Sequence, residues 1–292
     1  MEKAIKRYFP VFVLPTMIAF TIGFIAPFVM GIYLSFCKFT TVTDAKWIGL
    51  ENYMKIFNDP TDPFMHALWY TAAFTVVSVL LINVLAFTVA MLLTKKIRGT
   101  NIFRTVFFMP NLIGGIILGY IWQLLLNGIL MQFDRTLTYS SAYGFWGLVI
   151  LMCWQQVGYM MIIYIAGLQA VPEDMLEAAK IDGASNWQTL FKVTIPNVMP
   201  SITICTFLTL TNGFKLFDQN LALTGGLPYI INPDGTSVHT TEMLALNIYN
   251  TFYTTNTASR GVAQAKAVLF FVLVAGLSIM QLRMTRNKEV AA

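Results

Sequence analysis

The sequence predicts an all-α membrane protein with six transmembrane helices and a charged helix–turn–helix between the fourth and the fifth. Two observations lead to this fold class. Hydrophobic residues make up 57% of the 292 residues and charged residues only 11%, whereas a soluble domain carries about a quarter charged residues. Six stretches also stay apolar over the roughly 20 residues that cross a bilayer. We therefore expect one transmembrane domain over residues 1–292.

The six candidate spans are separated by loops of moderate size. The first follows a basic N-terminal segment and is uncharged from Tyr8 to Cys37, which is too long for the apolar part of a secretory signal. It is interpreted as a signal anchor. In the last span, Lys266 lies near one end, where a long side chain can reach the interface. The predicted spans are about residues 11–36, 67–94, 105–126, 145–169, 197–222 and 262–283.

Lysine and arginine predict the orientation, because they concentrate in cytoplasmic loops. With a cytoplasmic N-terminus, the inner segments hold 12 of the 19 basic residues, namely Lys3, Lys6, Arg7, Lys95, Lys96, Arg98, Arg104, Lys180, Lys192, Arg283, Arg286 and Lys288. Six spans then return the C-terminus to the cytoplasm. Residues 171–196 become a cytoplasmic loop, and residues 37–66 and 223–261 become outer loops. The first outer loop is expected to contain a turn followed by a short interfacial helix. The second is expected to contain a Gly/Pro turn and a re-entrant or surface helix.

The sequence contains no pattern for a cofactor, a metal or catalysis. Cys37, Cys153 and Cys205 lie far apart, and His66 and His239 are isolated, so metal-ligand spacing is missing. No Gly-x-x-x-x-Gly-Lys phosphate loop occurs. The spans hold no cluster of His, Asp or Glu. We therefore expect no enzymatic activity and no bound cofactor, and any ATP that drives the process must bind another polypeptide.

The loop between spans four and five begins with a helix. Pro172 suits a helix start, and Glu173 and Asp174 complement the positive end of the helix dipole. The helix is expected to run to about Ile181. Gly183 then stops it, because glycine readily takes the left-handed conformation at a helix end.

A second short helix follows the glycine bend directly. Ser185 and Gln188 have the spacing of a capping box, and Ile195-Pro196 is expected to end this helix. The polar side of the loop is acid-rich, whereas a helix on the membrane surface is rich in Lys and Arg. This favours a protein partner, although an ordinary amphipathic helix on the headgroups remains an alternative.

Glu177 offers that partner a charge, and Ala178 and Ala179 let its surface approach closely. These residues resemble the signature of the membrane permeases of bacterial ABC importers, which is Glu-Ala-Ala, three residues, Gly, and then a hydrophobic residue before Pro. Here it stands as Glu177-Ala178-Ala179, Gly183 and Ile195-Pro196. The position between two late spans also agrees.

Other stretches resemble the carbohydrate-uptake permeases of that family. Gly49-Leu50-Glu51-Asn52-Tyr53 is similar to their Gly-Leu-x-Asn-Tyr after span one. Gly225-Gly226-Leu227-Pro228 is similar to their Gly-Gly-Pro after span five, with Leu227 as a departure that we expect to change the turn locally. Arg260 to Ala267 is most similar to permeases for raffinose-type and multiple-sugar uptake.

The resemblance implies the type I ABC importer permease fold in the bacterial cytoplasmic membrane. It also implies the partners: a second homologous permease in a heterodimer, two copies of an ATPase that bind ATP and Mg, and an extracellular binding protein that delivers a sugar, expected to be an oligosaccharide. The coupling residues would be Glu177, paired with a basic residue of the ATPase, Ala178 and Ala179 at the contact, Gly183 at the bend, and Pro196.

Polar residues within spans are candidates for the substrate path, because they usually face a cavity or a partner. Asparagine and glutamine also join helices, tryptophan lies in interface belts, and Lys215 can pair with Asp218 at i,i+3, so these structural roles stay open. The candidates are Trp154, Gln155 and Tyr159 in span four, and Thr209, Asn212, Lys215, Asp218 and Gln219 in span five. Of those in span five, all but Asp218 recur at roughly helical spacing on one face.

Two other functions remain as alternatives. The same machinery could import another solute such as a glycerol phosphate, which would favour basic side chains in the cavity, and Lys215 is the one clear candidate. An ATP-independent secondary transporter or channel would be expected to show inverted repeats or intramembrane acids. The sequence shows no repeat, and Asp218 is the only acid near the interior of a span.

Overall fold

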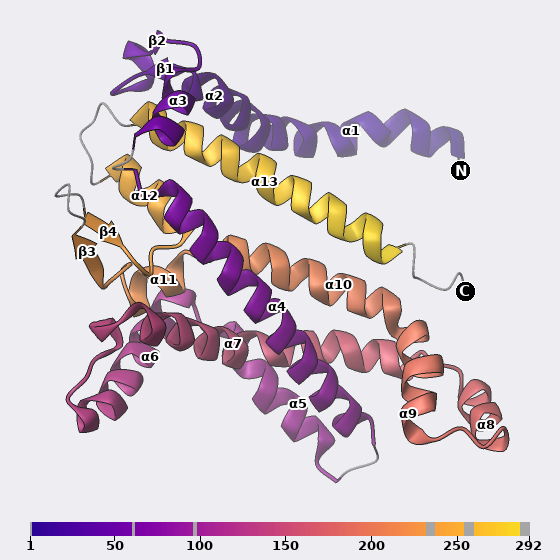
Figure 1. The fold of residues 1–292 in the computed structure, drawn as a ribbon. Coiled ribbons are helices and arrows are strands. Elements are labelled where there is room, and N and C mark those ends of the chain that lie inside the picture. Colours follow the sequence, from indigo (N-terminus) through magenta and orange to yellow (C-terminus); the bar gives the residue numbers. More distant parts are fainter. Residues whose placement is uncertain (1, 60–61, 96–97, 232–236, 254–259, 287–292) are drawn as a thin grey trace. The chain divides into compact units, whose positions relative to one another are not determined.

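The computed structural model describes residues 2–59, 62–95, 98–231, 237–253 and 260–286. The chain forms two compact units, Met1–Asp62 with Ile248–Val272 and Pro63–Asn247 with Leu273–Ala292 (Figure 1). Among the described residues, six helices are long and apolar enough to cross a membrane, which confirms the predicted number of spans. They are Val11–Ser35, Phe64–Thr94, Gly115–Phe133, Ser141–Gln169, Asn186–Phe214 and Arg260–Thr285.

The core of the larger unit is formed by three long helices, α4 (Phe64–Thr94), α7 (Ser141–Gln169) and α10 (Ile195–Phe214). Helix α7 is the most buried of the six and contacts both of the others. Asn83 of α4 joins all three helices, because its side chain accepts a hydrogen bond from the Tyr164 hydroxyl at 2.6 Å and donates to the Thr209 hydroxyl at 3.0 Å. An amide that is half-buried and hydrogen-bonded to two other helices fixes how these helices pack.

The third predicted span is not one continuous helix. Residues 105–126 contain the end of α5 (Thr100–Phe108), a 3₁₀ turn (Met109–Leu112) and the start of α6 (Gly115–Leu130). Pro110 cannot continue the hydrogen-bond ladder of α5, and Ile113 and Gly114 are extended. The predicted span therefore starts and ends too early in the sequence, because the long apolar helix is Gly115–Phe133. Two further 3₁₀ turns follow, Met131–Phe133 and Leu137–Tyr139.

The fifth predicted span also has different limits. Helix α9 (Asn186–Thr189), a π-helical turn (Leu190–Thr194) and α10 form one uninterrupted helix, so the predicted stop at Ile195-Pro196 is wrong. Proline lacks an N–H donor, and the π turn directly before it is a common way for a helix to absorb such an irregularity. At its other end α10 stops at Phe214, and a separate helix, α11 (Asp218–Leu223), follows.

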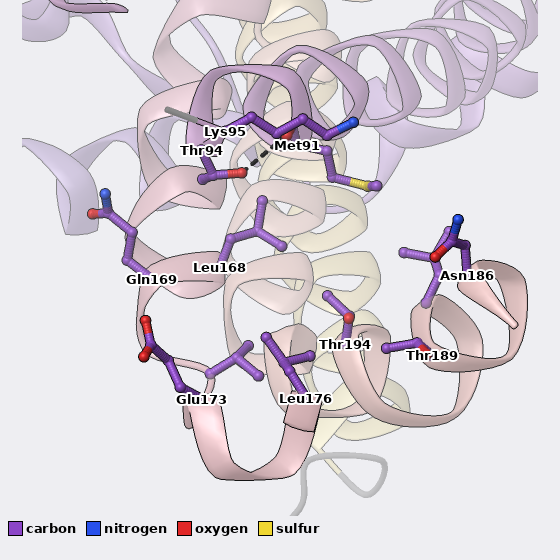
Figure 2. Close-up of a pocket in the computed structure, with 12 residues that line it drawn as sticks. Met91, Thr94, Lys95, Leu168, Gln169, Glu173, Leu176, Asn186, Thr189 and Thr194 are labelled. Carbon is purple, nitrogen blue, oxygen red and sulfur yellow. Dashed lines mark hydrogen bonds between the residues drawn. The ribbon is translucent and has the colours of Figure 1, made fainter. Parts of the chain in front are cut away.

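The α8 end of this unit, where α4 and α7 end and α9 begins, carries the short helix α8 (Glu173–Ile181). Figure 2 shows the last residues of α4 facing α8 and α9 across a groove. At the opposite, hairpin end lie the paired strands β3 (Tyr229–Ile231) and β4 (Ser237–His239). Gly225 and Gly226 have positive φ in the turn before β3, and the Leu227–Pro228 peptide is cis.

Asn220 attaches the hairpin to the core. Its buried side chain donates to the carbonyl of Thr241 at 2.8 Å and accepts from the backbone N–H of Met243 at 3.0 Å. Helix α12 (Leu244–Tyr253) begins directly afterwards, and the Leu244 N–H donates to the Thr71 hydroxyl of α4 at 2.8 Å. The turn and the helix predicted within residues 223–261 are both present, and a strand pair that was not predicted lies between them.

The smaller unit begins with a continuous helix made of α1 (Glu2–Phe20), a π turn (Thr21–Ile25) and α2 (Ala26–Ser35). Nearly all its described apolar side chains are exposed within the chain, as expected for a helix surrounded by lipid or a partner. Phe20, Phe24 and Phe28 stack along one face at 5.2 and 6.3 Å between ring centroids. Phe28 also meets Phe271 of α13 (Arg260–Arg286) edge-on at 5.0 Å.

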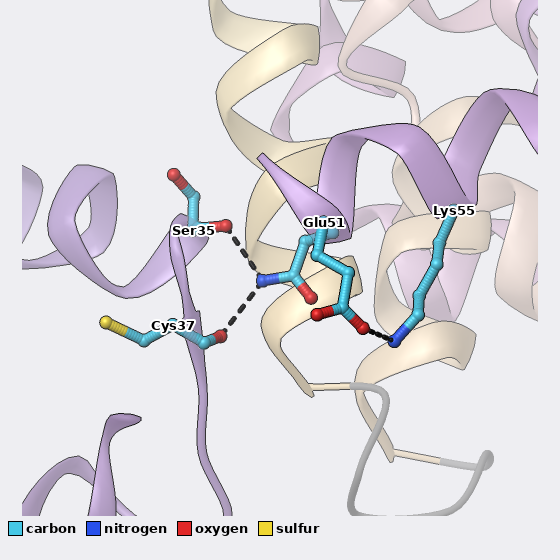
Figure 3. Close-up of polar contacts among 5 residues, drawn as sticks. Ser35, Cys37, Glu51 and Lys55 are labelled. Carbon is cyan, nitrogen blue, oxygen red and sulfur yellow. Dashed lines mark hydrogen bonds and ion pairs between the residues drawn. The ribbon is translucent and has the colours of Figure 1, made fainter. Parts of the chain in front are cut away.

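A short loop structure follows this helix. Strands β1 (Cys37–Lys38) and β2 (Lys46–Trp47) pair around a 3₁₀ turn (Val42–Asp44), and α3 (Glu51–Asn58) comes next. Asn52 fixes α3 by donating to the carbonyls of Ser35 and Cys37, both at 2.9 Å (Figure 3). On the exposed side, Glu51 pairs with Lys55 at 2.8 Å, and the hydrogen bond from that ammonium lowers the pKa of the Glu51 carboxyl. The predicted turn and helix are confirmed.

Lys266 in α13 does not extend to an interface as predicted. Its side chain is 1% exposed, pairs with Asp62 at 2.7 Å and donates to the Thr251 hydroxyl at 2.9 Å. A buried ammonium needs a counter-ion and further hydrogen-bond acceptors. Asp62 and Thr251 supply both, so this lysine is a structural element of the smaller unit.

Candidate functional site

Helix α8 has a well-defined end at each side. Glu173 and Asp174 occupy its first turn, where they complement the helix dipole. At the other end Gly183 has φ +72°, and its N–H donates to the carbonyl of Lys180 at 3.1 Å, while the N–H of Ala184 donates to that of Ala179 at 2.9 Å. This pair of bonds is a Schellman motif, so the predicted glycine stop is confirmed.

Helix α9 starts after four intervening residues, 182–185. The Ser185 side chain accepts from the Gln188 N–H at 3.3 Å, and the Gln188 side chain accepts from the Ser185 N–H at 2.7 Å. The predicted capping box is therefore confirmed. Because Gly183, which stops α8, and Ser185, which caps α9, are separated by Ala184 alone, the bend between the helices has little conformational freedom.

The two alanines of the Glu-Ala-Ala segment have different surroundings. Glu177 and Ala178 are exposed, whereas Ala179 is buried. Helix α8 contacts the π turn Leu190–Thr194 within the same chain. Ala178 therefore leaves room for another surface, as predicted, while the small side chain of Ala179 lets the chain pack on itself.

Large apolar side chains are exposed around the same bend. Ile181 is 86% and Trp187 is 70% exposed, and the Trp187 ring stacks on Phe191 at 5.9 Å. Exposed apolar groups this large, beside the exposed Glu177, are typical of a surface that binds another protein. Pro196 is half-buried in the first turn of α10, so it shapes the helix behind this surface.

A second feature is a hollow of about 290 Å³ at the other end of α10. It lies where α7, α10 and α11 meet, and it exists because α10 stops at Phe214 and α11 starts at Asp218. Gln219 donates to the side-chain oxygen of Gln155 at 2.8 Å, and Asn212 donates to that of Gln156 at 3.3 Å. The lining residues are Met152, Gln156, Asn212, Lys215, Leu216, Phe217, Asp218 and Gln219.

The charges in this hollow balance. Lys215 and Asp218 are both exposed there, and no ion pair within 4.0 Å joins them in the described part of the chain. The expected i,i+3 pairing fails because the helix ends between them. The hollow thus presents one cation, one anion and three amides to whatever enters it.

Comparison with known proteins identifies the family. Residues 95–288 match the model of the "binding-protein-dependent transport system inner membrane component" family. The chain is also 40% identical to the "probable starch degradation products transport system permease protein" of Thermoanaerobacterium thermosulfurigenes, over 96% of this chain and 94% of that protein. The chain belongs to this family of ABC importer permeases.

Two further matches agree with this assignment. A "multiple sugar-binding transport system permease protein" of Streptococcus mutans is 29% identical to this permease and spans 99% of both chains. The crystal structure of a bacterial ABC transporter that imports the acidic polysaccharide alginate contains a chain with TM-score 0.77 at 20% identity, covering 98% of each. The permease therefore has the type I importer fold and spans the bacterial cytoplasmic membrane several times. Subunits of this kind are not themselves enzymes.

Four candidate path residues of the permease do not line the hollow. Trp154 is exposed and meets Trp122 edge-on at 5.6 Å, and Tyr159 lies near Phe108. Thr209 is buried, donates to the Cys205 carbonyl at 2.8 Å and accepts from Asn83, which is the helix-joining role left open for polar residues. Gln155 is buried behind the hollow, where it orients Gln219.

Sequence reasoning missed two polar residues of the permease. Gln156 lines the hollow, and its position next to Gln155 in an apolar run was a usable signal. Asn83 is the only amide in the uncharged run 67–94, which marked it as a residue with a buried partner. In the described part of the chain, no three His, Cys, Asp or Glu side chains are placed to hold a metal ion.

Proposed function

We propose that this permease moves a sugar across the membrane by alternating access, driven by ATPase subunits that bind α8. The observation that carries this proposal is the exposed Glu177 and Ala178 on a helix that is fixed at both ends. After the four-residue bend 182–185, an unbroken helix follows. That helix runs from Asn186 to Phe214. At 1.5 Å per residue it places Asn212 of the hollow about 39 Å from Asn186, so displacement of the bend moves one wall of the substrate hollow.

The proposed orientation places α8 in the cytoplasm and both termini on the same side. The positive-inside rule supports it, because Lys95, Lys180 and Lys192 lie at the α8 end of the larger unit. In this orientation Glu177 faces the compartment that holds ATP, and the hairpin end faces the extracellular binding protein from which the family takes its name.

The proposed assembly is a heterodimer with a second homologous permease, two copies of an ATPase, and the binding protein. Glu177 would pair with a basic residue of one ATPase, and Ala178 would allow the close contact. ATP and Mg would bind the ATPase subunits, since this sequence contains no phosphate loop. Closure of the two ATPases would displace α8 and open the hollow to the outside.

A neutral sugar fits the hollow better than a phosphate ester. Its amides can form hydrogen bonds with hydroxyl groups, and Asp218 beside Lys215 would repel the two negative charges of a phosphate. One similar protein is named an sn-glycerol-3-phosphate permease, at 26% identity. Those named for starch degradation products and multiple sugars match at higher identity. We therefore propose an oligosaccharide as the substrate.

Reconstitution tests this function. Proteoliposomes that hold the complete complex, purified from its own cells, are given the binding protein, internal ATP and either a labelled malto-oligosaccharide or labelled glycerol 3-phosphate. ATP-dependent uptake of the sugar alone is expected. Uptake by the permease without its ATPases, or uptake of the phosphate ester instead of the sugar, would refute the proposal.

A further inference from the structure

A groove of about 630 Å³ lies between the end of α4 and the bend at α8 and α9. Figure 2 shows its two sides, with Thr94 and Lys95 of α4 on one and Glu173, Leu176 and Thr189 on the other. Helix α4 thus approaches α8 and α9 without filling the space between them. A volume of this size accommodates a group of side chains or a small molecule.

The walls of the groove do not suit lipid. Apolar side chains such as Met91 and Leu176 alternate with hydroxyl and amide groups, including Thr94 and Asn186. Lys95 and Glu173 add one charge of each sign. A lipid chain would leave these polar groups without partners, which is costly. A mixture of apolar, hydrogen-bonding and oppositely charged groups is the usual composition of a protein–protein interface.

The groove is continuous with the surface that carries Glu177. Glu173 lies one turn before Glu177, so the two side chains are neighbours on one face of α8. Glu173 lines the groove, and its neighbour Glu177 is exposed. A protein seated against Glu177 and Ala178 therefore also meets the opening of the groove.

We propose that a protruding segment of the ATPase occupies this groove and contacts the end of α4 together with α8. This inference rests on the proposed function, in which that ATPase binds Glu177. The segment would place an apolar side chain between Met91 and Leu176 and an acidic group near Lys95. The ATPase would then hold two elements of the permease, so that α4 moves with the bend and carries its contacts with α7 and α10.

Filling the groove from the α4 side tests this inference without changing α8. Thr94→Trp places an indole in the groove, whereas Thr88→Trp places the same group on an exposed part of the same helix. Thr88 and Thr94 each donate only to their own helix, to the carbonyls of Val84 and Met91. We expect Thr94→Trp to weaken ATPase binding to the permease complex in detergent about tenfold, and Thr88→Trp to leave it unchanged.

Equal ATPase affinity in both variants would overturn the inference. A photo-reactive maleimide–benzophenone on Thr94→Cys, in a background without Cys37, Cys153 and Cys205, gives an independent result. Cross-linking to the ATPase supports the inference, whereas cross-linking to the second permease, to lipid or to nothing contradicts it. Glu177→Lys separates the two proposals. If it weakens coupling while Thr94→Trp has no effect, only the groove is misassigned, and if neither acts, the proposed function fails as well.

Discussion

Gly183 offers a clean test of whether the bend between α8 and α9 transmits force. Its φ of +72° lies in the left-handed region, and a Cβ added there would meet no atom within 4 Å. Any substitution therefore acts through backbone conformation and not through collision. For a residue with an L side chain, this conformation costs about 1–2 kcal/mol. The cost is lower for asparagine than for other residues, and it is higher for valine, which is β-branched.

The assay is the amount of sugar imported per ATP hydrolysed in proteoliposomes. A penalty of about 1–2 kcal/mol corresponds to a factor of about 5–30 in the population of the native bend. We expect Gly183→Val to lower this ratio by a factor in that range and Gly183→Ala to lower it less. For Gly183→Asn the ratio should stay close to the native value. The reasoning is refuted if valine leaves the ratio unchanged, or if asparagine lowers it as much as valine does.

The remaining predictions concern stability in detergent. Gly158→Ala should lower the unfolding temperature, because its Cβ would collide with the backbone carbonyl of Phe107 and such overpacking costs about 1–3 kcal/mol. Gly128→Ala, whose Cβ meets nothing within 4 Å, is the control. Lys266→Met should cost about 3–5 kcal/mol, because it removes the buried ammonium that pairs with Asp62, and adding Asp62→Asn should restore part of it. Equal unfolding temperatures for Gly158→Ala and Gly128→Ala would contradict the first assignment. Additive losses of stability in the double variant Lys266→Met, Asp62→Asn would contradict the second.

Local signals predicted the helix–turn–helix well. The stop at Gly183 and the box of Ser185 and Gln188 depend on bonds between residues that are close in sequence. Such bonds form wherever the surrounding chain lies, so residue types at a fixed spacing are sufficient to recognise them. The number of spans was predictable for a similar reason, because hydropathy depends on composition over about 20 residues.

Features that depend on packing were not predictable in this way. Pro110 and Pro196 are both prolines in apolar runs, yet the first interrupts a helix and the second lies within one behind a π turn. Ala179 looked equivalent to Ala178, and only the contact of α8 with the π turn shows that it is buried. The pairing of Lys266 with Asp62 could not be recognised, because Asp62 lies some 200 residues earlier in the sequence. Lys266 was therefore expected at an interface, which a long side chain can reach.

For the same reason, the candidate substrate path was predicted only in part. Asn212, Lys215, Asp218 and Gln219 do line one hollow, but through a break between α10 and α11 and not along one helical face. Thr209 shares the apparent periodicity and instead binds Asn83. Polar residues on one face are candidates for a path or for helix contacts, and the choice between them depends on what the neighbouring helices present.

The central claim is that Glu177 transmits ATPase motion to the sugar path, and one ratio tests it most directly. Sugar imported per ATP hydrolysed is measured in proteoliposomes for the native complex, for Glu177→Lys, and for Asp182→Lys, a charge reversal at another exposed position of the same loop. The account predicts that Glu177→Lys lowers the ratio at least about tenfold, while Asp182→Lys and sugar capture by the binding protein stay near native. A native ratio in Glu177→Lys would contradict the claim.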